Sequence, residues 1–167
     1  VQESGQNVFS ETNTISYDSL SRVSQIAYLN ADKSVKYKYN KNNGLLETIT
    51  HSDLGDYSVS YHSTNGNIKT VSYPRNSGTE TFYYEGGLGR LSQIVYPNLT
   101  KLNFTWNSKN QMTRITYLDN GNVTNYLFSY NFAGRVSSYT KTEGGIQSEN
   151  WTFNYGPYGL EKATRNT

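Results

Sequence analysis

The chain has 167 residues, of which 15 are Lys or Arg and 13 are Asp or Glu, so its formal net charge is +2. This length suffices for a buried core, while the balanced charge and the scattered basic residues argue against nucleic acid as the main partner. The sequence contains no Cys, which excludes a disulfide framework and a thiol nucleophile, and it has no apolar run long enough for a membrane span.

An aromatic residue followed by a turn recurs along the chain at intervals of 22 to 25 residues, and we call these residues the anchors. Two residues before each anchor stands another apolar residue, an alternation that places both side chains on one face of a strand. The pattern predicts seven hairpin units, whose anchors are Tyr17, Tyr39, Tyr61, Tyr84, Trp106, Tyr130 and Tyr155.

The first unit continues from its anchor into RVSQIAYLN at 22–30, and the fourth unit repeats this phrase as RLSQIVYPN at 90–98, with six of nine positions identical. Such a phrase is either a binding site used twice or the strand of a repeating structure. Weaker copies such as MTRITYLDN at 112–120 favour the strand. We therefore interpret the phrase as the return strand of a hairpin.

Each return strand carries an apolar residue after the turn and a second one three positions later, as in Val136 and Tyr139. An interval of three interrupts the two-residue period of a strand and predicts a β-bulge or a local twist. The links between units have turn signals of their own at 76–78, 119–121 and 144–145. No sustained 3.6-residue apolar pattern predicts a helix.

The predicted fold class is therefore all-β, with about seven tandem hairpin repeats in a coiled antiparallel meander. Because one hairpin cannot bury its apolar face alone, neighbouring hairpins must stack or pair side by side, and a coiled sheet of this kind can curl into an open barrel. We treat residues 1–167 as a single domain. Its outer strands have unpaired backbone groups, so we expect the natural polypeptide to be longer, with further repeats or capping domains as partners.

The unit aromatic-Asp-x-x-Gly-Arg-Leu, followed by a second strand, resembles the YD-repeat or Rhs (rearrangement hotspot) family. The best matches are YDSLSRV at 17–23, YEGGLGRL at 84–91 and YNFAGRV at 130–136, and the resemblance covers about residues 13–160. It implies a β-sheet strip that spirals into a hollow shell. Members include bacterial polymorphic toxins, insecticidal toxin-complex components and the animal teneurins; the strip encloses a cytotoxic segment in toxins and serves adhesion or display in surface proteins.

The chain departs from the family at the motif Asp-Pro-x-Gly-Leu, which ends complete toxin shells and is associated with self-cleavage by aspartates. Here the segment at 155–160 reads YGPYGL, with Gly156 in place of the first Asp. Glycine cannot supply a carboxylate, so we do not expect self-cleavage at this site. Seven units are also too few to enclose a toxin domain unaided.

The sequence has no pattern typical of a catalytic or metal site. His51 and His62 are eleven residues apart and have no further ligand at helical spacing. Asp53 and Asp56 are the nearest pair of acids, but their segment has the composition of a turn. Neither a nucleophile elbow nor a phosphate-binding loop occurs. We therefore predict no enzyme activity, no catalytic residues, no metal ion and no cofactor.

Exposed aromatic faces can stack on sugar rings, and Trp106 and Trp151 are the two candidates for such glycan binding. The anchors, Trp106 included, also recur as sheet-packing residues do, whereas Trp151 stands four residues before its anchor and is less constrained by the repeat. The arginines at 22, 90 and 135 share one slot after the turn. We expect them to pair with turn acids such as Asp18 or Glu85 rather than to bind an anion.

These observations predict a non-enzymatic scaffold or shell segment of a bacterial YD-repeat protein that is secreted or on the cell surface, of the toxin-delivery or surface-display type. The alternative is a carbohydrate- or receptor-binding adhesin module, with a glycan or a cell-surface receptor as partner. A cryptic hydrolase is a third class. We expect neither nucleic acid as a partner nor a transmembrane segment.

Overall fold

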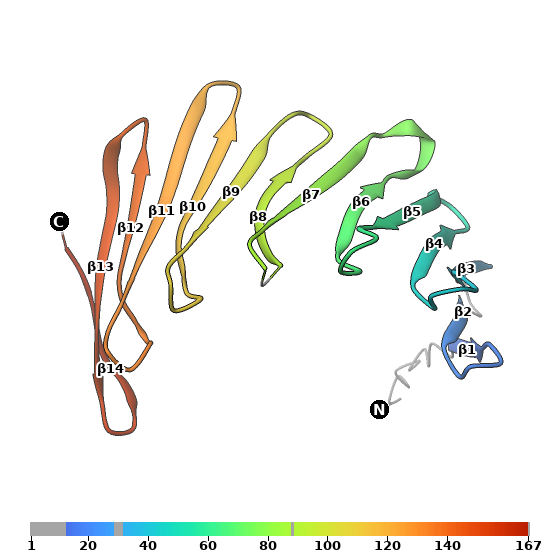
Figure 1. Ribbon diagram of the computed structural model, residues 1–167, viewed down its shortest axis with the longest axis horizontal. Helices are drawn as coiled ribbons and strands as arrows, with labels where there is room; N and C mark the ends of the chain where they lie inside the picture. The colour runs from blue at the N-terminus through green and yellow to red at the C-terminus, as the bar shows by residue number, and fades with distance from the viewer. Residues whose placement is uncertain (1–12, 29–31, 88, 167) are drawn as a thin grey trace, which may run out of the picture. The chain divides into compact units, whose positions relative to one another are not determined.

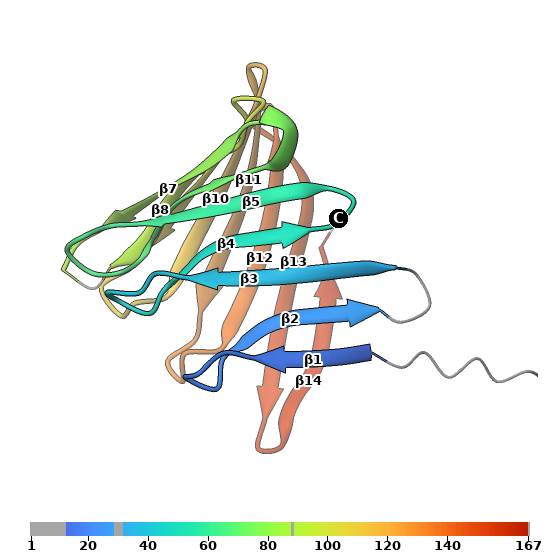
Figure 2. The ribbon, with the colours of Figure 1, turned by 90° about the vertical axis from the view of Figure 1, so that its right-hand side faces the viewer.

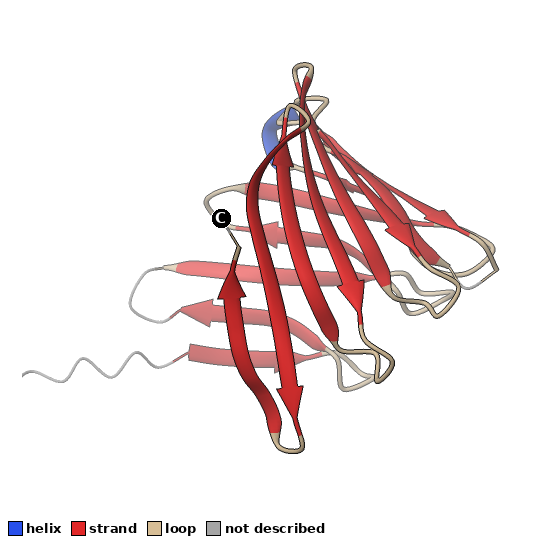
Figure 3. Cartoon of the chain, turned by 90° about the vertical axis from the view of Figure 1, so that its left-hand side faces the viewer, coloured by secondary structure: helices blue, strands red, loops and turns tan. Residues whose placement is uncertain are grey.

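The structure, a computed structural model, describes residues 13–28, 32–87 and 89–166. Apart from one 3-10 turn at Pro74–Asn76, these residues form strands and loops (Figure 3), and no helix among them is long and apolar enough to cross a membrane. The strands are β1 (Asn13–Tyr17), β2 (Val23–Tyr28), β3 (Lys33–Tyr39), β4 (Leu46–His51), β5 (Gly55–Tyr61), β6 (Ile68–Ser72), β7 (Thr79–Glu85), β8 (Arg90–Val95), β9 (Lys101–Trp106), β10 (Met112–Asp119), β11 (Asn122–Tyr130), β12 (Val136–Glu143), β13 (Ile146–Gly156) and β14 (Gly159–Arg165).

Consecutive strands are hydrogen-bonded neighbours, so the order in the sheet is the order in the sequence, from β1 to β14. Each anchor lies at or next to the end of an odd-numbered strand, and the turn after it leads into the next even-numbered strand. The two copies of the duplicated phrase form β2 and β8, although residues 29–30 of the first copy lie outside the described residues. The prediction of an all-β meander of hairpin repeats is confirmed. The sheet does not close, because β1 and β14 are its two edge strands.

The chain divides into two compact units, which we call unit 1 (Val1–Ser60 with Val71–Ser77) and unit 2 (Tyr61–Thr70 with Gly78–Thr167). Within unit 1, strands β1 to β5 run side by side (Figure 2). Within unit 2, strands β7 to β14 form neighbouring hairpins in a single layer (Figure 1). That the whole chain acts as one domain stays a prediction.

A β-bulge follows the turn in six of the hairpins. In the sixth unit the anchor Tyr130 pairs with Val136, the register then skips Ser137, and Phe128 pairs with Tyr139. The equivalent skipped residues are Ser24, Glu47, Ser92, Thr113 and Glu161. The predicted bulge is confirmed, and it explains the three-residue interval. Because the bulge absorbs the extra residue, both apolar residues of the return strand stay on the face of the anchor.

The register gives the hairpins one apolar and one polar face. Phe104, Ile115 and Tyr126 lie next to one another across β9, β10 and β11. The adjacent positions on these strands carry polar side chains, such as Thr116 and Asn125, which form a 2.9 Å hydrogen bond. Alternation along each strand therefore sorts the aromatic residues onto one face.

The apolar face is only half-buried. Among the described residues no apolar side chain is fully buried, and Thr100, 5% exposed, is the one buried residue. Ring pairs on this face lie within one layer, as in Phe128–Tyr139 with 5.7 Å between centroids and Tyr126–Tyr139 with 6.5 Å. The stability of each unit therefore comes from the backbone ladder and from contacts between neighbouring strands.

Candidate functional site

Four of the anchor side chains connect their hairpin to the preceding one. Tyr130 donates its hydroxyl hydrogen to the carbonyl of Met112 at 2.6 Å, and Trp106 donates from Nε1 to the carbonyl of Leu91 at 2.9 Å. The same bond runs from Tyr39 to Val23 at 2.9 Å and from Tyr155 to Val136 at 2.8 Å. In all four cases the acceptor is the residue that pairs with the preceding anchor. The most regular side chains of the repeat are therefore engaged inside the sheet.

The residue after the anchor caps its turn. Oδ1 of Asp18 accepts hydrogen bonds from the backbone amides of Leu20 at 2.9 Å and Arg22 at 3.0 Å. Oδ1 of Asn131 accepts equivalent bonds from Ala133 and Arg135, both at 3.0 Å. Asn40 and Asn107 cap their turns in the same way. Asp and Asn suit this slot because their short side chains satisfy turn N–H groups.

The arginine after the first turn contacts three groups. Nη2 of Arg22 lies 2.7 Å from Oδ2 of Asp18, Nη1 donates to the carbonyl of Gly44 at 3.0 Å, and the guanidinium carbon lies 4.2 Å from the ring centroid of Tyr39. Pairing with a turn acid was predicted. The contacts with the next turn and the next anchor were not, although the 22-residue spacing of Arg22 and Gly44 equals the repeat length and is visible in the sequence.

The other two arginines of this slot, Arg90 and Arg135, each make some of the contacts that Arg22 makes. Arg90 lies 3.1 Å from Glu85, as predicted. Arg135 has no acid in its turn, where Asn131 takes the place of Asp18, and it instead covers the ring of the next anchor, Tyr155, at 4.5 Å from the centroid. The arginine slot therefore serves contacts between repeats, with the acid as an addition where the turn supplies one.

The two tryptophans lie on separate strands of unit 2, and both are half-buried. Trp106 is held by its bond to Leu91. Trp151 lies between Tyr139 of β12 and Arg165 of β14, and its Nε1 has no hydrogen-bond partner among the described residues. The structure does not bring the two residues together. Glycan stacking by either one stays a prediction.

The two histidines lie in or beside turns. Nδ1 of His51 accepts a hydrogen bond from the backbone amide of Asp53 at 3.1 Å. His62 takes the capping slot of the third repeat and lies edge-on to the ring of Tyr84, with 5.8 Å between centroids. In the part of the chain that the structure describes, no three His, Asp or Glu side chains gather to hold a metal ion.

The acidic side chains are arranged as partners of cations. Asp53 lies 2.7 Å from Nζ of Lys33, whose hydrogen bond lowers the pKa of the carboxyl group. Hydrogen bonds from basic partners likewise lower the pKa values of Asp18 and Glu47. A general acid needs the opposite, a raised pKa. Asp56, the second residue of the acid pair, lies within strand β5.

Gly156, which stands in place of the first Asp of the family motif, lies close to a side chain of the facing strand. A Cβ atom at this position would overlap the carboxylate of Glu161 on the facing strand. A larger residue here would have to displace that side chain. That no self-cleavage takes place at Gly156 stays a prediction.

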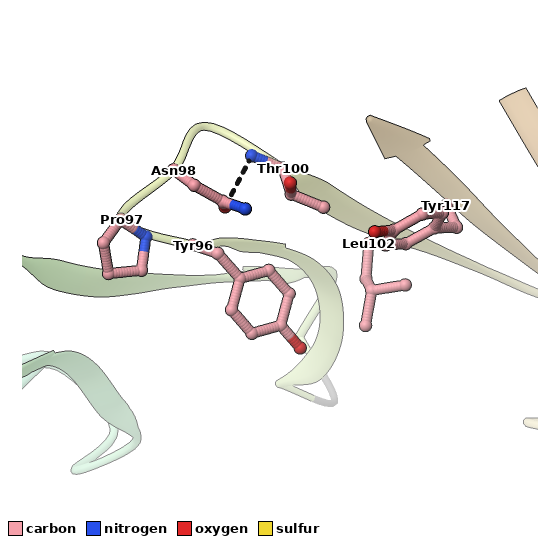
Figure 4. A pocket seen from close by; sticks show the side chains of 6 residues that line it. All are labelled: Tyr96, Pro97, Asn98, Thr100, Leu102 and Tyr117. Atoms are coloured by element: carbon pink, nitrogen blue, oxygen red, sulfur yellow. Dashed lines mark hydrogen bonds between the residues drawn. The ribbon is translucent and has the colours of Figure 1, made fainter. Parts of the chain in front are cut away.

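A pocket of about 410 Å³ lies at the link between β8 and β9 in unit 2 (Figure 4). It is lined by Tyr96, Pro97, Asn98, Thr100, Leu102 and Tyr117. Leu102 of β9 pairs with both Ile94 and Tyr117, which places the pocket on the apolar face. This pocket was not predicted from the sequence. A signal was present, because the link reads Pro-Asn-Leu where the later links contain Gly.

The link at this pocket is a constrained turn. Oδ1 of Asn98 accepts from the backbone amide of Thr100 at 3.1 Å, and the amide of Leu99 donates to the carbonyl of Tyr96 at 2.9 Å. The backbone of Leu99 has φ of 67°, a region that a bulky residue rarely adopts. The strained turn ends at Thr100, the buried residue described above.

Fold and contacts together define a class of protein: an open array of β-hairpin repeats connected by aromatic anchors. The family model described as Teneurin YD-shell matches residues 4–157. The chain belongs to this family, and the resemblance to YD-repeat proteins is confirmed. Among curated proteins nothing matches the chain.

Several solved structures share the fold. The chain aligns with a crystal structure of TcdB2-TccC3-Cdc42 at a TM-score of 0.68 and 11% identity, over 92% of this chain and 9% of that one. It aligns with TcdB2-TccC3 without its hypervariable C-terminal region at a TM-score of 0.67 and 12% identity, over 92% of this chain and 9% of that one. The alignment with TcdB2-TccC3-TEV has a TM-score of 0.56 and 14% identity, over 86% of this chain and 10% of that one. The chain thus spans a tenth or less of the length of these proteins, and the likeness concerns the fold alone.

Proposed function

We propose that this chain is a non-enzymatic scaffold that forms part of a shell wall in a bacterial protein, secreted or on the cell surface, of the toxin-delivery or surface-display type. The proposal rests on the contacts made by the side chains that recur in each repeat, the anchors and the residues after them. Four anchors, Tyr39, Trp106, Tyr130 and Tyr155, bond to the preceding hairpin, and the residues after four of the anchors cap their own turns. Side chains that recur in order to join neighbouring repeats serve architecture, and membership of the YD-shell family supports the same role.

The ionisable groups support a role without catalysis. The carboxyl groups of Asp18, Glu47 and Asp53 have lowered pKa values, so they are poor proton donors near neutral pH. Burial raises the pKa of the anchors Tyr61 and Tyr84, as expected for side chains that pack within the sheet.

We further propose that residues 1–167 form one stretch of wall, joined to more repeats or capping domains of the same polypeptide. The half-exposed aromatic face supports this, because apolar area left open in a single layer gains stability when another layer covers it. The share of only 9% of a TcdB2-TccC3 chain that the fold matches agrees with a part of a larger assembly.

Electron microscopy of the natural polypeptide that carries this sequence tests the proposal. We expect a hollow β-sheet shell whose wall includes β1 to β14. Fractionation of the producing cells should place the polypeptide in the medium or on the cell surface. A solid domain without a lumen, or a polypeptide confined to the cytoplasm, would contradict the proposal.

Carbohydrate or receptor binding is a second candidate function, favoured by Trp151, whose Nε1–H has no hydrogen-bond partner among the described residues. Under this function Trp151→Ala abolishes retention on a glycan array while a melting curve shows that the variant is still folded. Trp106→Ala should instead lower the melting temperature, because it removes the bond to Leu91. If the intact chain is not retained on the array even at high concentration, the glycan version of this function is wrong.

A further inference from the structure

We propose that the pocket at the β8–β9 link binds one neutral pyranose ring of a carbohydrate. The proposal is independent of the scaffold function, since a shell wall can carry a ligand site or lack one. It also differs from the two tryptophan candidates, because neither Trp106 nor Trp151 lines this pocket.

The pocket offers an apolar surface of suitable shape. In Figure 4 the rings of Tyr96 and Tyr117 flank the side chain of Leu102, and Pro97 lies at the end of the turn. The C–H groups on one face of a pyranose pack well against aromatic rings, which supply apolar area with a polar edge. Two tyrosines from different strands can therefore hold one sugar ring.

Polar groups stand at the rim of this surface. The hydroxyls of Tyr96 and Tyr117 and Nδ2 of Asn98 have no hydrogen-bond partner within residues 13–28, 32–87 and 89–166. Behind them, Thr100 and Asp119 are joined at 3.3 Å through Oγ1 and Oδ1. The rim thus combines donors with acceptors, as the paired hydroxyls of a sugar require.

The uncharged lining and the volume of the pocket favour a small, neutral ligand. None of the six lining residues is charged, so nothing in the lining would compensate a phosphate, a carboxylate or an ammonium group. A volume of about 410 Å³ lies near the lower end of small-molecule sites, which suits one or two rings better than an extended chain.

The site is formed before any ligand arrives. Oδ1 of Asn98 is fixed by the amide of Thr100, which orients Nδ2, and Pro97 has a restricted φ. Pro97 is also backed by Gly78, where any Cβ atom would overlap the proline ring. A strained, over-determined turn beside a pocket is typical of ligand sites, because pre-organisation lowers the entropy lost on binding.

NMR titration of the ¹⁵N-labelled chain tests the proposal. The probes are the methyl glycosides of glucose, galactose, mannose and N-acetylglucosamine, at concentrations on the order of 10 mM, since single-ring sites bind weakly. We expect at least one glycoside to give saturable shifts of the amide signals of Asn98, Thr100 and Tyr117. The absence of saturable shifts with all four would overturn the proposal.

Three variants locate the binding. Tyr117→Ala should weaken it by about tenfold or more, and Tyr117→Phe, which keeps the ring and the fold, should weaken it about threefold by removing one rim hydroxyl. Tyr83→Ala is the control, because Tyr83 is 48% exposed and lies outside the pocket. A melting curve of each variant shows that it is folded.

Other outcomes assign the pocket differently. Shifts confined to Trp106 or Trp151 would move sugar binding out of the pocket and overturn the proposal. Equal affinities of the wild type and Tyr117→Phe, together with a folded Tyr117→Ala that still binds, would do the same. Saturable pocket shifts with a proline-rich peptide and none with the glycosides would identify a peptide site instead.

Discussion

Gly78 supports the β8–β9 link from an adjacent turn. Its φ of 111° is unfavourable for any residue with a Cβ atom, and an added Cβ would overlap Pro97. We expect Gly78→Ala to lower the free energy of unfolding by about 2–4 kcal/mol, the sum of backbone strain and overpacking. Urea denaturation measures this change.

Gly121→Ala is the matched control for that substitution. Gly121 also has a positive φ, 85°, but an added Cβ would meet no atom within 4 Å. Only the backbone strain of about 1–2 kcal/mol should remain. If both variants lose the same stability, the close contact between Gly78 and Pro97 contributes nothing.

The pair of Asp18 and Arg22 predicts a dependence on pH. The hydrogen bond from Arg22 lowers the pKa of Asp18 below its ordinary 3.8. A lowered pKa in the folded state means that the pair stabilises the fold above the ordinary value and that this contribution is lost as the pH falls through the lowered one. Asp18→Asn should keep the turn, as Asn131 does, and remove this part of the pH dependence.

Melting temperatures of both proteins, measured from neutral to acid pH, check the prediction. The melting temperatures of the wild type and Asp18→Asn should differ at neutral pH and become equal in acid. The difference at neutral pH should be modest, because the ion pair is at the surface. Curves that stay parallel over the whole range would show that the ion pair does not contribute.

Single residues were predictable from the sequence where one repeat explains them. The anchors, the capping slot and the pairing of Arg22 with Asp18 all follow from recurrence. The pocket does not, because it depends on Tyr96 and Tyr117 lining one cavity from the β8–β9 link and from β10, a placement that no single repeat encodes. Nor did the sequence indicate that the Trp106 side chain is held by a backbone carbonyl.

At the level of elements, the bulge decides which face each return strand presents. An alanine inserted between Ser138 and Tyr139 shifts the rest of β12 by one residue and moves Tyr139 to the polar face. The ring contacts of Tyr139 with Tyr126 and Phe128 should be lost. We expect a lower melting temperature and a weaker near-ultraviolet circular dichroism signal.

A glycine inserted between Gly144 and Gly145 is the control for this element. The turn between β12 and β13 is exposed at these glycines, so the extra residue extends a loop and leaves the strand faces unchanged. The melting temperature should stay close to that of the wild type. Equal losses from both insertions would mean that the register of β12 is not specified by its faces.

The strands themselves were largely predictable, for a physical reason. Alternation, turn residues and the three-residue interval are local signals, and they gave the hairpins and their bulges. The bonds from four anchors to the preceding hairpin join residues 15 to 19 positions apart, and a strand pattern contains no donor or acceptor information.

For the molecule as a whole, the architecture is a series of nearest-neighbour contacts. Each strand pairs with the strands before and after it in the sequence, and the contacts of anchors and turns follow the same order. The sequence predicted this class because repetition is its strongest signal. It did not predict that the apolar face would stay half-exposed, since one strand pattern fits both a covered and an uncovered sheet.

The central claim is that the repeated aromatic residues serve the sheet. Removing one anchor hydroxyl tests it most directly, through the free energy of unfolding of Tyr130→Phe beside the control Tyr83→Phe. We predict a loss of about 0.5–1.5 kcal/mol for Tyr130→Phe, which loses the 2.6 Å bond to Met112. We predict none for Tyr83→Phe, because Tyr83 is 48% exposed and its hydroxyl has no partner among the described residues. Equal stabilities of the two variants would contradict the claim.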